Sequence, residues 1–337
     1  MDFMARFSLS LILAAGGFLH LFSPELFDAA IPWGPKWPIN LFVGIFELLL
    51  ALGLWLRLSR DYAARLSALW FLILIPIHVY VSINHIEMFG ISNPVLLWIR
   101  TLLQPLLFFW ALSLQRKGWI MAQTWKDVVF LHYEVDAQEL QKKVPFKLDL
   151  YQGKAIVSIV AFCMDRIRFP FLPSVPGLKK LNELNLRTYV EVDGIKGVYF
   201  FTLEADLIPA IWIAKTFFSL PYRYSKISQQ LNQPHYQFNQ TGLNTSLKIN
   251  AEIGEGKSSS PFDLWATERY GLFTKRGSKT LHGIVRHDPW KLRGVTLNTI
   301  EDQFSNQLGE HLRAQSFSEI SYCCELKVRF QPFYQLS

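Results

Sequence analysis

Four long apolar segments in the first third of the chain constrain its fold more than any other feature. They cover residues 3–22, 38–57, 66–83 and 94–115. At 1.5 Å of rise per residue, a helix of about 20 residues spans roughly 30 Å, the thickness of the hydrocarbon core of a bilayer. The first segment lacks the small-residue cleavage site of a signal peptide, and three similar segments follow it. The sequence therefore predicts an all-α bundle of four transmembrane helices.

The charges of the connecting loops predict the orientation of this bundle. The loops at 23–37 and 84–93 contain only one basic residue between them, Lys36. Basic residues gather instead around the loop after the second segment and directly after the fourth: Arg57, Arg60, Arg65, Arg116 and Lys117. Because loops rich in Lys and Arg stay in the cytoplasm, we expect a multi-pass inner-membrane protein whose two termini are both cytoplasmic.

Five polar residues lie within or beside the apolar segments: His20, Glu47, His78, Arg100 and Gln104. A charged side chain inside a bilayer is costly and is expected to face other polar groups of the protein. We therefore expect these residues to face one another, with Glu47 and Arg100 in contact directly or through His78. Such a cluster would form a pocket for a small or quinone-like molecule or a proton path, or it would only fix the register of the helices.

Four runs of these segments carry a family resemblance. AAGGFLHLFSPELFDAAIPW, FVGIFELLLALGLWL, IHVYVSINHIEM and LLWIRTLLQPLLFFWAL resemble the DoxX-like membrane proteins. The most specific shared residues are His20, Pro24, Phe27, Glu47, Leu52, Gly53 and Leu54. DoxX-like proteins are four-helix integral membrane proteins, and several are linked by name to quinone or thiosulfate oxidation. The resemblance implies the topology and a membrane redox complex as a partner.

Beyond residue 120 the pattern changes to that of a soluble α+β domain. This part carries 26 Lys and Arg against 21 Asp and Glu without a long basic run, so nucleic-acid binding gains no support. Helices are expected at 209–218 and around 299–308, and Asp193-Gly194 predicts a hairpin with a loop longer than two residues. Alternating apolar residues predict several strands, among them 154–164, 186–192, 197–205 and 319–330.

Many strands with one or two helices favour a closed or partly closed, mainly antiparallel β-barrel. We therefore expect two domains, a transmembrane bundle at 1–117 and a cytoplasmic domain at 118–337.

The motifs of several classes of site do not occur. Cys163, Cys323 and Cys324 lack the CxxC or Cys/His spacing of zinc sites, so we expect reduced cytosolic thiols. Cys323 and Cys324 are adjacent in a predicted strand, where neighbouring side chains point to opposite faces. HExxH, P-loop, GxGxxG and GxSxG motifs are missing as well. We therefore expect neither a metal nor a cofactor.

Several ordered motifs between residues 121 and 335 carry a second resemblance: QTWKDVVFLHYEVD, LRTYVEVDGIKGVYFFTLEAD, FFSLPYRYS, WATERYGLF and RHDPWKL. They resemble the YqjF-like family of uncharacterised proteins, which belongs to the acetoacetate decarboxylase-like superfamily. The decarboxylases carry a catalytic lysine pair directly after a proline, and the similar segment here is 214–223. Tyr222 and Arg223 occupy the positions of the two lysines. A glutamate of the decarboxylases is similar in placement to Glu183.

The missing lysine pair decides the chemistry that this resemblance implies. Schiff-base decarboxylation needs an amine nucleophile whose pKa is lowered by its surroundings. Tyr222 cannot form an imine, and the guanidinium of Arg223 stays protonated. We therefore expect no acetoacetate decarboxylation. We expect a retained pocket for a small carboxylate or carbonyl compound, with Arg223 or Arg187 as the group that binds the anion.

Each of the remaining candidates has a structural alternative. Glu183 and Arg187 lie four residues apart, so a salt bridge explains them equally well, and Tyr222 could be a packed core residue. Glu268 and Tyr270 would share one face of a strand and extend the ligand site. His132 and His287 are candidate acids or bases, because the histidine pKa lies near neutrality, although such histidines are more often structural.

Three functions remain open at this point. The first is a membrane-tethered protein that binds a small organic ligand in the barrel. The second is a membrane-tethered enzyme that uses Glu183, Tyr222 and a histidine for acid–base chemistry on a small or lipophilic substrate. The third is a structural partner of a membrane redox complex. A histidine within hydrogen-bond reach of Glu183 or Tyr222 would favour the enzyme.

Overall fold

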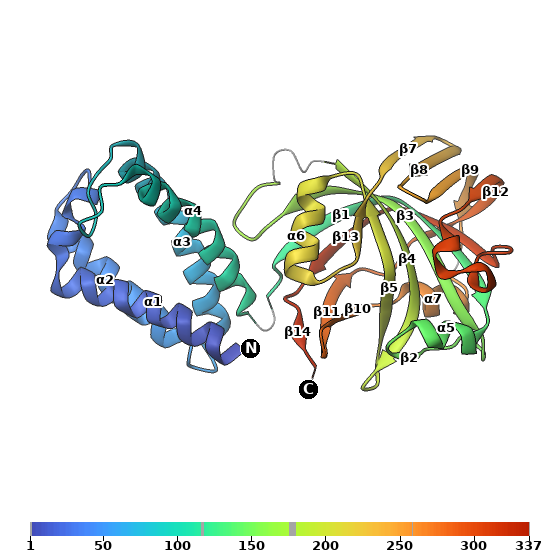
Figure 1. The fold of residues 1–337 in the computed structure, drawn as a ribbon, viewed down its shortest axis with the longest axis horizontal. Coiled ribbons are helices and arrows are strands. Elements are labelled where there is room, and N and C mark those ends of the chain that lie inside the picture. The colour runs from blue at the N-terminus through green and yellow to red at the C-terminus, as the bar shows by residue number, and fades with distance from the viewer. Residues whose placement is uncertain (1, 116–117, 175–179, 258, 337) are drawn as a thin grey trace. The chain divides into compact units, whose positions relative to one another are not determined.

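The computed structural model describes residues 2–115, 118–174, 180–257 and 259–336. The chain divides into two compact units, Met1–Ile120 and Met121–Ser337, where the sequence analysis places the boundary between 117 and 118. Figure 1 shows helices alone in the first unit and a large sheet with a few helices in the second. Each unit is described by itself below.

The first unit contains four helices that are long and apolar enough to cross a membrane. They are α1 (Asp2–Phe22), α2 (Lys36–Gly53), α3 (Arg60–Ile83) and α4 (Pro94–Ser113). The α3 helix begins at Arg60 rather than at residue 66, because its first turns are polar and the hydrophobic pattern detects only the apolar part of a helix. Most of the large apolar side chains on the outer surfaces of these helices are exposed, among them Leu11, Phe42 and Leu102. Such a surface is suited to lipid.

The four helices pair as two hairpins, α1 with α2 and α3 with α4 (Figure 1). Glycines allow the first pair to approach closely. A Cβ on Gly17 would lie 2.8 Å from the backbone oxygen of Gly44, and a Cβ on Gly44 would lie 2.9 Å from that of Gly17. At the far ends of the hairpins, a small apolar cluster joins the loop after α1 to α3 and α4: Ala30, Val81, Met88 and Leu97.

The polar residues of these helices do not form the single cluster expected from the sequence. Nδ1 of His20 lies 2.7 Å from Oδ1 of Asn40, which joins α1 to α2. Oε1 of Glu47 accepts a hydrogen bond from the indole of Trp70 at 3.0 Å, and none of the ion pairs of the described residues joins Glu47 to Arg100. The expected direct Glu47–Arg100 contact is therefore wrong, and the hydrogen bond of Glu47 goes to Trp70 and not to His78. A long indole on α3 reaches the carboxylate first, a possibility that helix depth alone does not reveal.

Several polar atoms of this expected cluster are buried without a hydrogen-bond partner. They are Oε2 of Glu47, Nδ1 of His78, one terminal nitrogen of Arg100 and Oε1 of Gln104. Gly16 leaves room for the carboxylate of Glu47, because a Cβ at this position would lie 2.5 Å from Oε2 of Glu47. The helices therefore carry polar groups inside them, but the hydrogen bonds of the described residues do not join the five expected residues to one another.

The second unit is built on a 14-stranded sheet with a mixed pattern. Its strands are β1 (Met121–Val135), β2 (Lys147–Leu148), β3 (Ala155–Arg168), β4 (Lys180–Val192), β5 (Ile195–Ala205), β6 (Tyr222–Tyr224), β7 (Lys226–Asn232), β8 (His235–Thr241), β9 (Ser246–Gly256), β10 (Gly271–Arg276), β11 (Lys279–His287), β12 (Leu292–Asp302), β13 (Glu319–Phe330) and β14 (Tyr334–Gln335). The helices are α5 (Ala137–Lys143), α6 (Ile208–Phe218) and α7 (Pro261–Thr267), with short 3₁₀ turns at Ser305–Leu308 and Glu310–Leu312.

Most neighbouring strands are antiparallel, as expected, but β5 pairs in parallel with both β6 and β10. The central order is β11-β10-β5-β4-β3-β1-β13, and β11 also pairs with β13. These pairings close a ring of strands. The sheet continues from β13 through β12, β9, β8 and β7. Figure 1 shows α6 beside the ring, close to β5.

Two local expectations are corrected by the strand register. Val192 pairs with Ile195, so Asp193-Gly194 alone forms the hairpin turn. Both turn residues have positive φ, 51° and 76°, as the tight two-residue turn requires. The helix expected around 299–308 is wrong: Thr299 and Ile300 pair with β9, and only a 3₁₀ turn follows. Their β-branched side chains fit a strand better than a helix. The helix expected at 209–218 is confirmed as α6.

Alternate side chains of the ring strands enter two different cores. On β1, Val128 and Phe130 join one core, whereas Val129 and Leu131 join the other. The first core lies inside the ring and includes Phe162, Trp290 and Leu326. The second core fills the space between the ring strands and the β7–β9 extension and includes Phe238 and Ile249. This period-two alternation decides which polar residues reach the interior of the ring.

Candidate functional site

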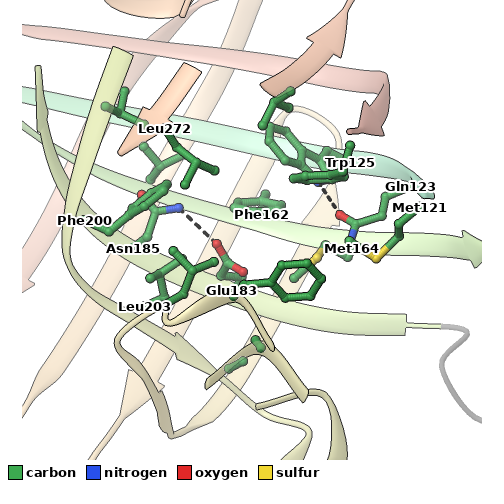
Figure 2. A pocket seen from close by; sticks show the side chains of 18 of the residues that line it. Met121, Gln123, Trp125, Phe162, Met164, Glu183, Asn185, Phe200, Leu203 and Leu272 are labelled. Carbon is green, nitrogen blue, oxygen red and sulfur yellow. Dashed lines mark hydrogen bonds between the residues drawn. The ribbon is translucent and has the colours of Figure 1, made fainter. Parts of the chain in front are cut away.

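A cavity of about 160 Å³ lies in the core inside the ring. Its wall is mostly apolar and rich in aromatic side chains, and Figure 2 shows Trp125, Phe162 and Phe200 around the carboxylate of Glu183. The indole of Trp125 donates to Oε1 of Gln123 at 2.9 Å on this wall. An apolar cavity with a few convergent polar groups is the usual form of a small-molecule site.

The β4 strand supplies the main polar groups of the cavity. Glu183, Asn185 and Arg187 follow one another at every second position, and all three line the cavity. The residues between them, Leu184 and Leu186, enter the other core. A register shift against β5 between Leu186 and Arg187 does not turn the arginine away from the cavity. One strand therefore places a carboxylate, an amide and a guanidinium in one row.

Glu183 is hydrogen-bonded to Tyr222 on the wall of the cavity. The hydroxyl of Tyr222 donates to Oε2 of Glu183 at 2.5 Å, and Nδ2 of Asn185 donates to Oε1 at 3.1 Å. The sheet explains how Tyr222 reaches this point, because β6 pairs with β5 at Leu203 and β5 pairs with β4 at Glu183. The expectation that Tyr222 shares a cavity with Glu183 therefore matches the geometry.

Burial changes the acidity of both groups. Glu183 is only 3% exposed. Loss of solvation raises the pKa of its carboxyl to about 7, against the opposing effect of the hydrogen bonds from Tyr222 and Asn185. Burial, followed by the neighbouring charge of Glu183, also raises the pKa of Tyr222 well above its ordinary value. Near neutral pH the tyrosine is therefore a donor, and the glutamate exists in both protonation states.

Arg187 is a buried cation without a compensating charge in hydrogen-bond contact. Its side chain is 8% exposed, and its Nε has no hydrogen-bond partner. Its guanidinium lies 5.6 Å from the ring centre of Phe130 and 6.0 Å from that of Tyr189. None of the ion pairs of the described residues includes Arg187. The salt bridge to Glu183 that the sequence left open is therefore not formed.

A second arginine at the cavity wall is paired. NH1 of Arg269 lies 2.6 Å from Oδ2 of Asp149, and both side chains are buried. Its guanidinium also stacks 4.6 Å from the ring centre of Trp265. Because Arg269 already has its anion, Arg187 is the cation that the cavity offers to a ligand.

Three of the ligand-binding residues expected from the sequence lie outside this cavity. Arg223 follows Tyr222 on the short β6 strand, so its side chain points the other way. It is exposed and donates to Gln307 at 3.0 Å. Glu268 and Tyr270 bond to each other and are not on the cavity wall, whereas Arg269 between them is. These assignments are wrong because a shift of one position along an extended chain reverses the direction of every side chain.

The two candidate histidines take different places, and neither bonds to Glu183 or Tyr222. His132 is fully buried beside the cavity, with Nδ1 2.7 Å from Oγ of Ser158 and 3.4 Å from the hydroxyl of Tyr189. Burial, helped by the charge of Arg187, lowers its pKa to about 3. A histidine that stays neutral in this way is a structural hydrogen-bonding group.

His287 does line the cavity. Its Nδ1 lies 2.9 Å from the backbone oxygen of Asp288, and its ring stacks 4.5 Å from Tyr270. Burial also lowers its pKa. It is therefore a neutral group on the wall, and it does not form the hydrogen bond to Glu183 or Tyr222 that the enzyme hypothesis requires.

Sequence reasoning missed Asn185, Arg269 and Gln123 as members of the site. The signal for Asn185 was present, because it lies between Glu183 and Arg187 at the same period of two. Gln123 and Arg269 carried no such signal, because the positions of their segments depend on the closure of the ring. The described residues on the cavity wall include no lysine, and no group of His, Cys, Asp or Glu in the described ranges could hold a metal ion.

Comparison with known proteins agrees with the division of the chain. Residues 9–115 match a domain of unknown function, DUF8561. The DoxX-like resemblance and its redox partner stay predictions. Residues 122–325 match DUF2071, a family of uncharacterized conserved proteins. The uncharacterized protein YqjF of Bacillus subtilis (strain 168) is 36% identical over 206 residues, which cover 57% of this chain and 84% of that protein.

Solved structures with a similar fold include enzymes. MppR, an enduracididine biosynthesis enzyme solved with HEPES buffer bound, superposes with a TM-score of 0.50 at 12% identity and covers 65% of this chain and 89% of its own. An acetoacetate decarboxylase from Legionella pneumophila has a TM-score of 0.49 at 11% identity, over 65% of this chain and 88% of its own. At such identities the likeness concerns the fold alone. The match over residues 122–325 and the identity to YqjF together establish that this chain belongs to the DUF2071 family.

Proposed function

We propose that the Met121–Ser337 unit binds a small organic anion inside the ring of strands. Arg187 would hold the anionic group, and Glu183, Asn185 and Tyr222 would contact the polar atoms beside it. The observation that carries this proposal is the buried guanidinium of Arg187, which faces the cavity without an ion pair. Of the two arginines expected from the sequence to bind the anion, Arg223 and Arg187, this proposal takes Arg187.

Charge balance supports an anion rather than a cation or a neutral molecule. A buried ion without a partner costs several kcal/mol, and a ligand carboxylate that pairs with it would recover much of this energy. Arg269 is neutralised by Asp149, and His287 is kept neutral by burial. Glu183 loses much of its negative charge near neutral pH because its pKa is about 7. The cavity is thus left with an excess of positive charge.

The size of the cavity limits the body of the ligand. An apolar cavity of about 150 Å³ holds one benzene molecule, and this cavity measures about 160 Å³. Aromatic rings on its wall offer stacking partners to a ligand ring. The ring centre of Trp125 lies 4.8 Å from that of Phe162 and 6.2 Å from that of Trp290. We therefore propose an acid with one ring, or a short branched acid of similar volume.

Calorimetric titration of the full chain in lipid nanodiscs tests this proposal. Benzoate and benzamide have nearly the same shape, but only benzoate carries a charge at neutral pH. We expect benzoate to bind and benzamide to bind much more weakly, because only the anion compensates Arg187. Equal affinity for the two compounds would refute an anion site, and binding of neither would refute a ring-sized ligand.

The pH dependence of benzoate binding should follow the protonation of Glu183. The pKa of this carboxyl is raised to about 7, so the group becomes negative as the pH rises through 7. The charged carboxylate then competes with the ligand for Arg187. Affinity should therefore be highest below about pH 7 and fall by up to about tenfold per pH unit above it, the limit set by one linked proton. Titrations between about pH 5.5 and 9 measure this slope, because benzoate is ionised over the whole of this range.

The conservative variant Glu183→Gln separates this explanation from a general effect of pH. Glutamine keeps the size of the side chain and can still bond to Tyr222, but it does not ionise. Its benzoate affinity should stay constant over the same pH range. A slope that persists in the glutamine variant would assign the pH dependence to another group.

A second candidate function is acid–base catalysis on a carbonyl compound. A carboxyl with a pKa of about 7 suits a general base, and the hydroxyl of Tyr222 could donate to a developing oxyanion. The positions of the histidines argue against the alternative enzyme that would use Glu183, Tyr222 and a histidine, because neither histidine forms a hydrogen bond with Glu183 or Tyr222. The binding function therefore has the stronger support.

Schiff-base chemistry should be absent in either case. The wall of the cavity carries no lysine among its described residues, so no amine is placed to attack a carbonyl. Borohydride treatment of the full chain in the presence of acetoacetate should therefore give no covalent adduct at the cavity, as measured by intact-protein and peptide mass spectrometry. A trapped adduct on a residue of the Met121–Ser337 unit would restore the decarboxylase mechanism.

The membrane anchoring belongs to the same proposal. Four helices of sufficient length and apolarity support a multi-pass chain, and the arginines around residues 57–65 support cytoplasmic termini. Topology reporters fused at Ser59 and after the C-terminus should both report the cytoplasm. An external signal from the C-terminal fusion would contradict this orientation.

A further inference from the structure

We infer that the outward face of α6 rests on the lipid surface of the membrane. This inference depends on the proposed membrane anchoring of the chain, but not on the identity of the ligand in the cavity. The outward face of α6 is defined here as Ile208, Trp212, Lys215 and Thr216.

Exposure of large apolar side chains on α6 is the first observation. Ile208 is 64% exposed and Trp212 is 63% exposed. They lie about one helical turn apart, so they share one side of the helix. The opposite side of α6 is occupied, because Ala210 and Ala214 line the cavity and Ile211 is buried. The helix is thus apolar on both faces, IPAIWIAKTFF, which is unusual for a helix that faces only water. A contiguous exposed apolar patch marks an interaction surface.

Charge is the second observation and favours lipid over a protein core. Residues 207–226 contain no Asp or Glu but contain Lys215, Arg223 and Lys226. All three of these basic side chains are exposed. Lys215 belongs to α6 itself, whereas Arg223 and Lys226 follow the helix in sequence, on β6 and β7. An apolar helical face that carries a basic residue is typical of helices that lie in the headgroup region of membranes containing anionic lipids. Trp212 and the half-exposed Tyr224 are residue types enriched at that depth.

The covalent connection is the third observation. The α4 helix ends at Ser113 and β1 begins at Met121, so seven residues join the last apolar helix to the sheet. Seven residues reach at most about 25 Å when fully extended. If the helices are anchored as proposed, such a tether limits the distance between the end of α4 and the start of β1. A surface of modest affinity is then sufficient for stable contact, because the second binding event is intramolecular.

The C-terminal end of α6 is fixed to the sheet, so the helix can present this face without unfolding. Ser219, which caps its C-terminus in the left-handed region, accepts hydrogen bonds from Thr274 at 2.9 Å and from Arg276 at 2.7 Å. Pro209 at the first turn replaces a backbone donor that would have no helical partner. The outward face is thus a preformed surface.

Depth-dependent fluorescence quenching tests this inference in the full chain. The exposed Cys324 is first replaced by serine; Cys163 and Cys323 are buried. Single cysteines at Ile208, Trp212, Leu243 or Leu49 then carry an environment-sensitive NBD probe in nanodiscs of phosphatidylcholine and phosphatidylglycerol. Leu243 is a matched control, because it is 96% exposed in the turn between β8 and β9 of the same unit. Leu49, 60% exposed on α2, is the reference for the membrane interior.

We expect the probes at 208 and 212 to emit at shorter wavelength and to lose emission with shallow doxyl-labelled lipids. The probe at 49 should lose emission with deep doxyl labels, and the probe at 243 with neither. Emission at 208 and 212 that matches the probe at 243 overturns the inference, and so does a blue shift without quenching, which would indicate a protein partner. If deep doxyl labels do not quench the probe at position 49, the membrane anchoring on which the inference depends is wrong. Benzoate binding is measured separately, so the ligand site can survive each of these failures.

Discussion

Replacing Arg187 with glutamine should weaken benzoate binding by roughly 30- to 1,000-fold, which corresponds to about 2–4 kcal/mol for loss of one partner of a buried charge pair. Glutamine fills a similar space but carries no charge, so the ligand carboxylate would be buried without a counter-ion. Titration calorimetry of the full chain in nanodiscs measures the change. The variant should remain folded, because it removes a buried cation that has no ion pair within the protein.

Arg223→Gln is the matched control for this experiment. Arg223 is exposed, lies outside the cavity wall and donates a hydrogen bond to Gln307. Its replacement should leave the affinity for benzoate unchanged. A large loss in the Arg223 variant together with a small loss in the Arg187 variant would move the anion site to Arg223, the other arginine that the family resemblance allowed.

The largest loss of stability is expected from Asp149→Ala. Asp149 holds Arg269 at 2.6 Å, and the side chains of the pair are only 8% and 3% exposed. Removing the carboxylate leaves a buried guanidinium without its partner, which costs about 3–5 kcal/mol. In a domain of this size that loss lowers the melting temperature by roughly 6–20 °C. Denaturant unfolding followed by tryptophan fluorescence measures the free energy of unfolding.

Lys154→Ala supplies the contrast for the stability measurement. Lys154 pairs with Glu134 at 2.8 Å, but these side chains are 60% and 45% exposed. Water screens such a pair, so its removal should cost less than about 1 kcal/mol. Equal losses in the two variants would mean that burial does not set the energy of the Asp149–Arg269 pair.

The elements of the fold could be predicted from local patterns wherever one pattern dominates a segment. The four apolar helices, the strand at 319–330 and the helix α6 are examples. The strand at 299–302 was mistaken for a helix because apolar spacing over so few residues fits both periods, and pairing with β9 decided the outcome. Pattern also fails to show ring closure, since the β11–β13 pairing joins residues far apart in the sequence.

The site could be predicted in part, and the errors share one physical cause. Glu183 and Tyr222 were placed together correctly by the resemblance, and the β5–β6 pairing explains why. Each wrongly assigned residue is the sequence neighbour of one that lines the cavity. Arg223 follows Tyr222, and Glu268 and Tyr270 flank Arg269. In extended chain an error of one residue reverses the side chain. The burial that makes Arg187 and Glu183 chemically unusual exists only once the ring has closed.

Crystallographic analysis of the full chain with para-bromobenzoate is the strongest test of the anion site at Arg187, because the anomalous signal of bromine locates the ligand without bias. We expect a bromine peak among the aromatic residues inside the ring, with the carboxylate about 3 Å from the guanidinium of Arg187. An empty cavity at saturating ligand, or a carboxylate bound at Arg223 on the outer surface, would contradict it.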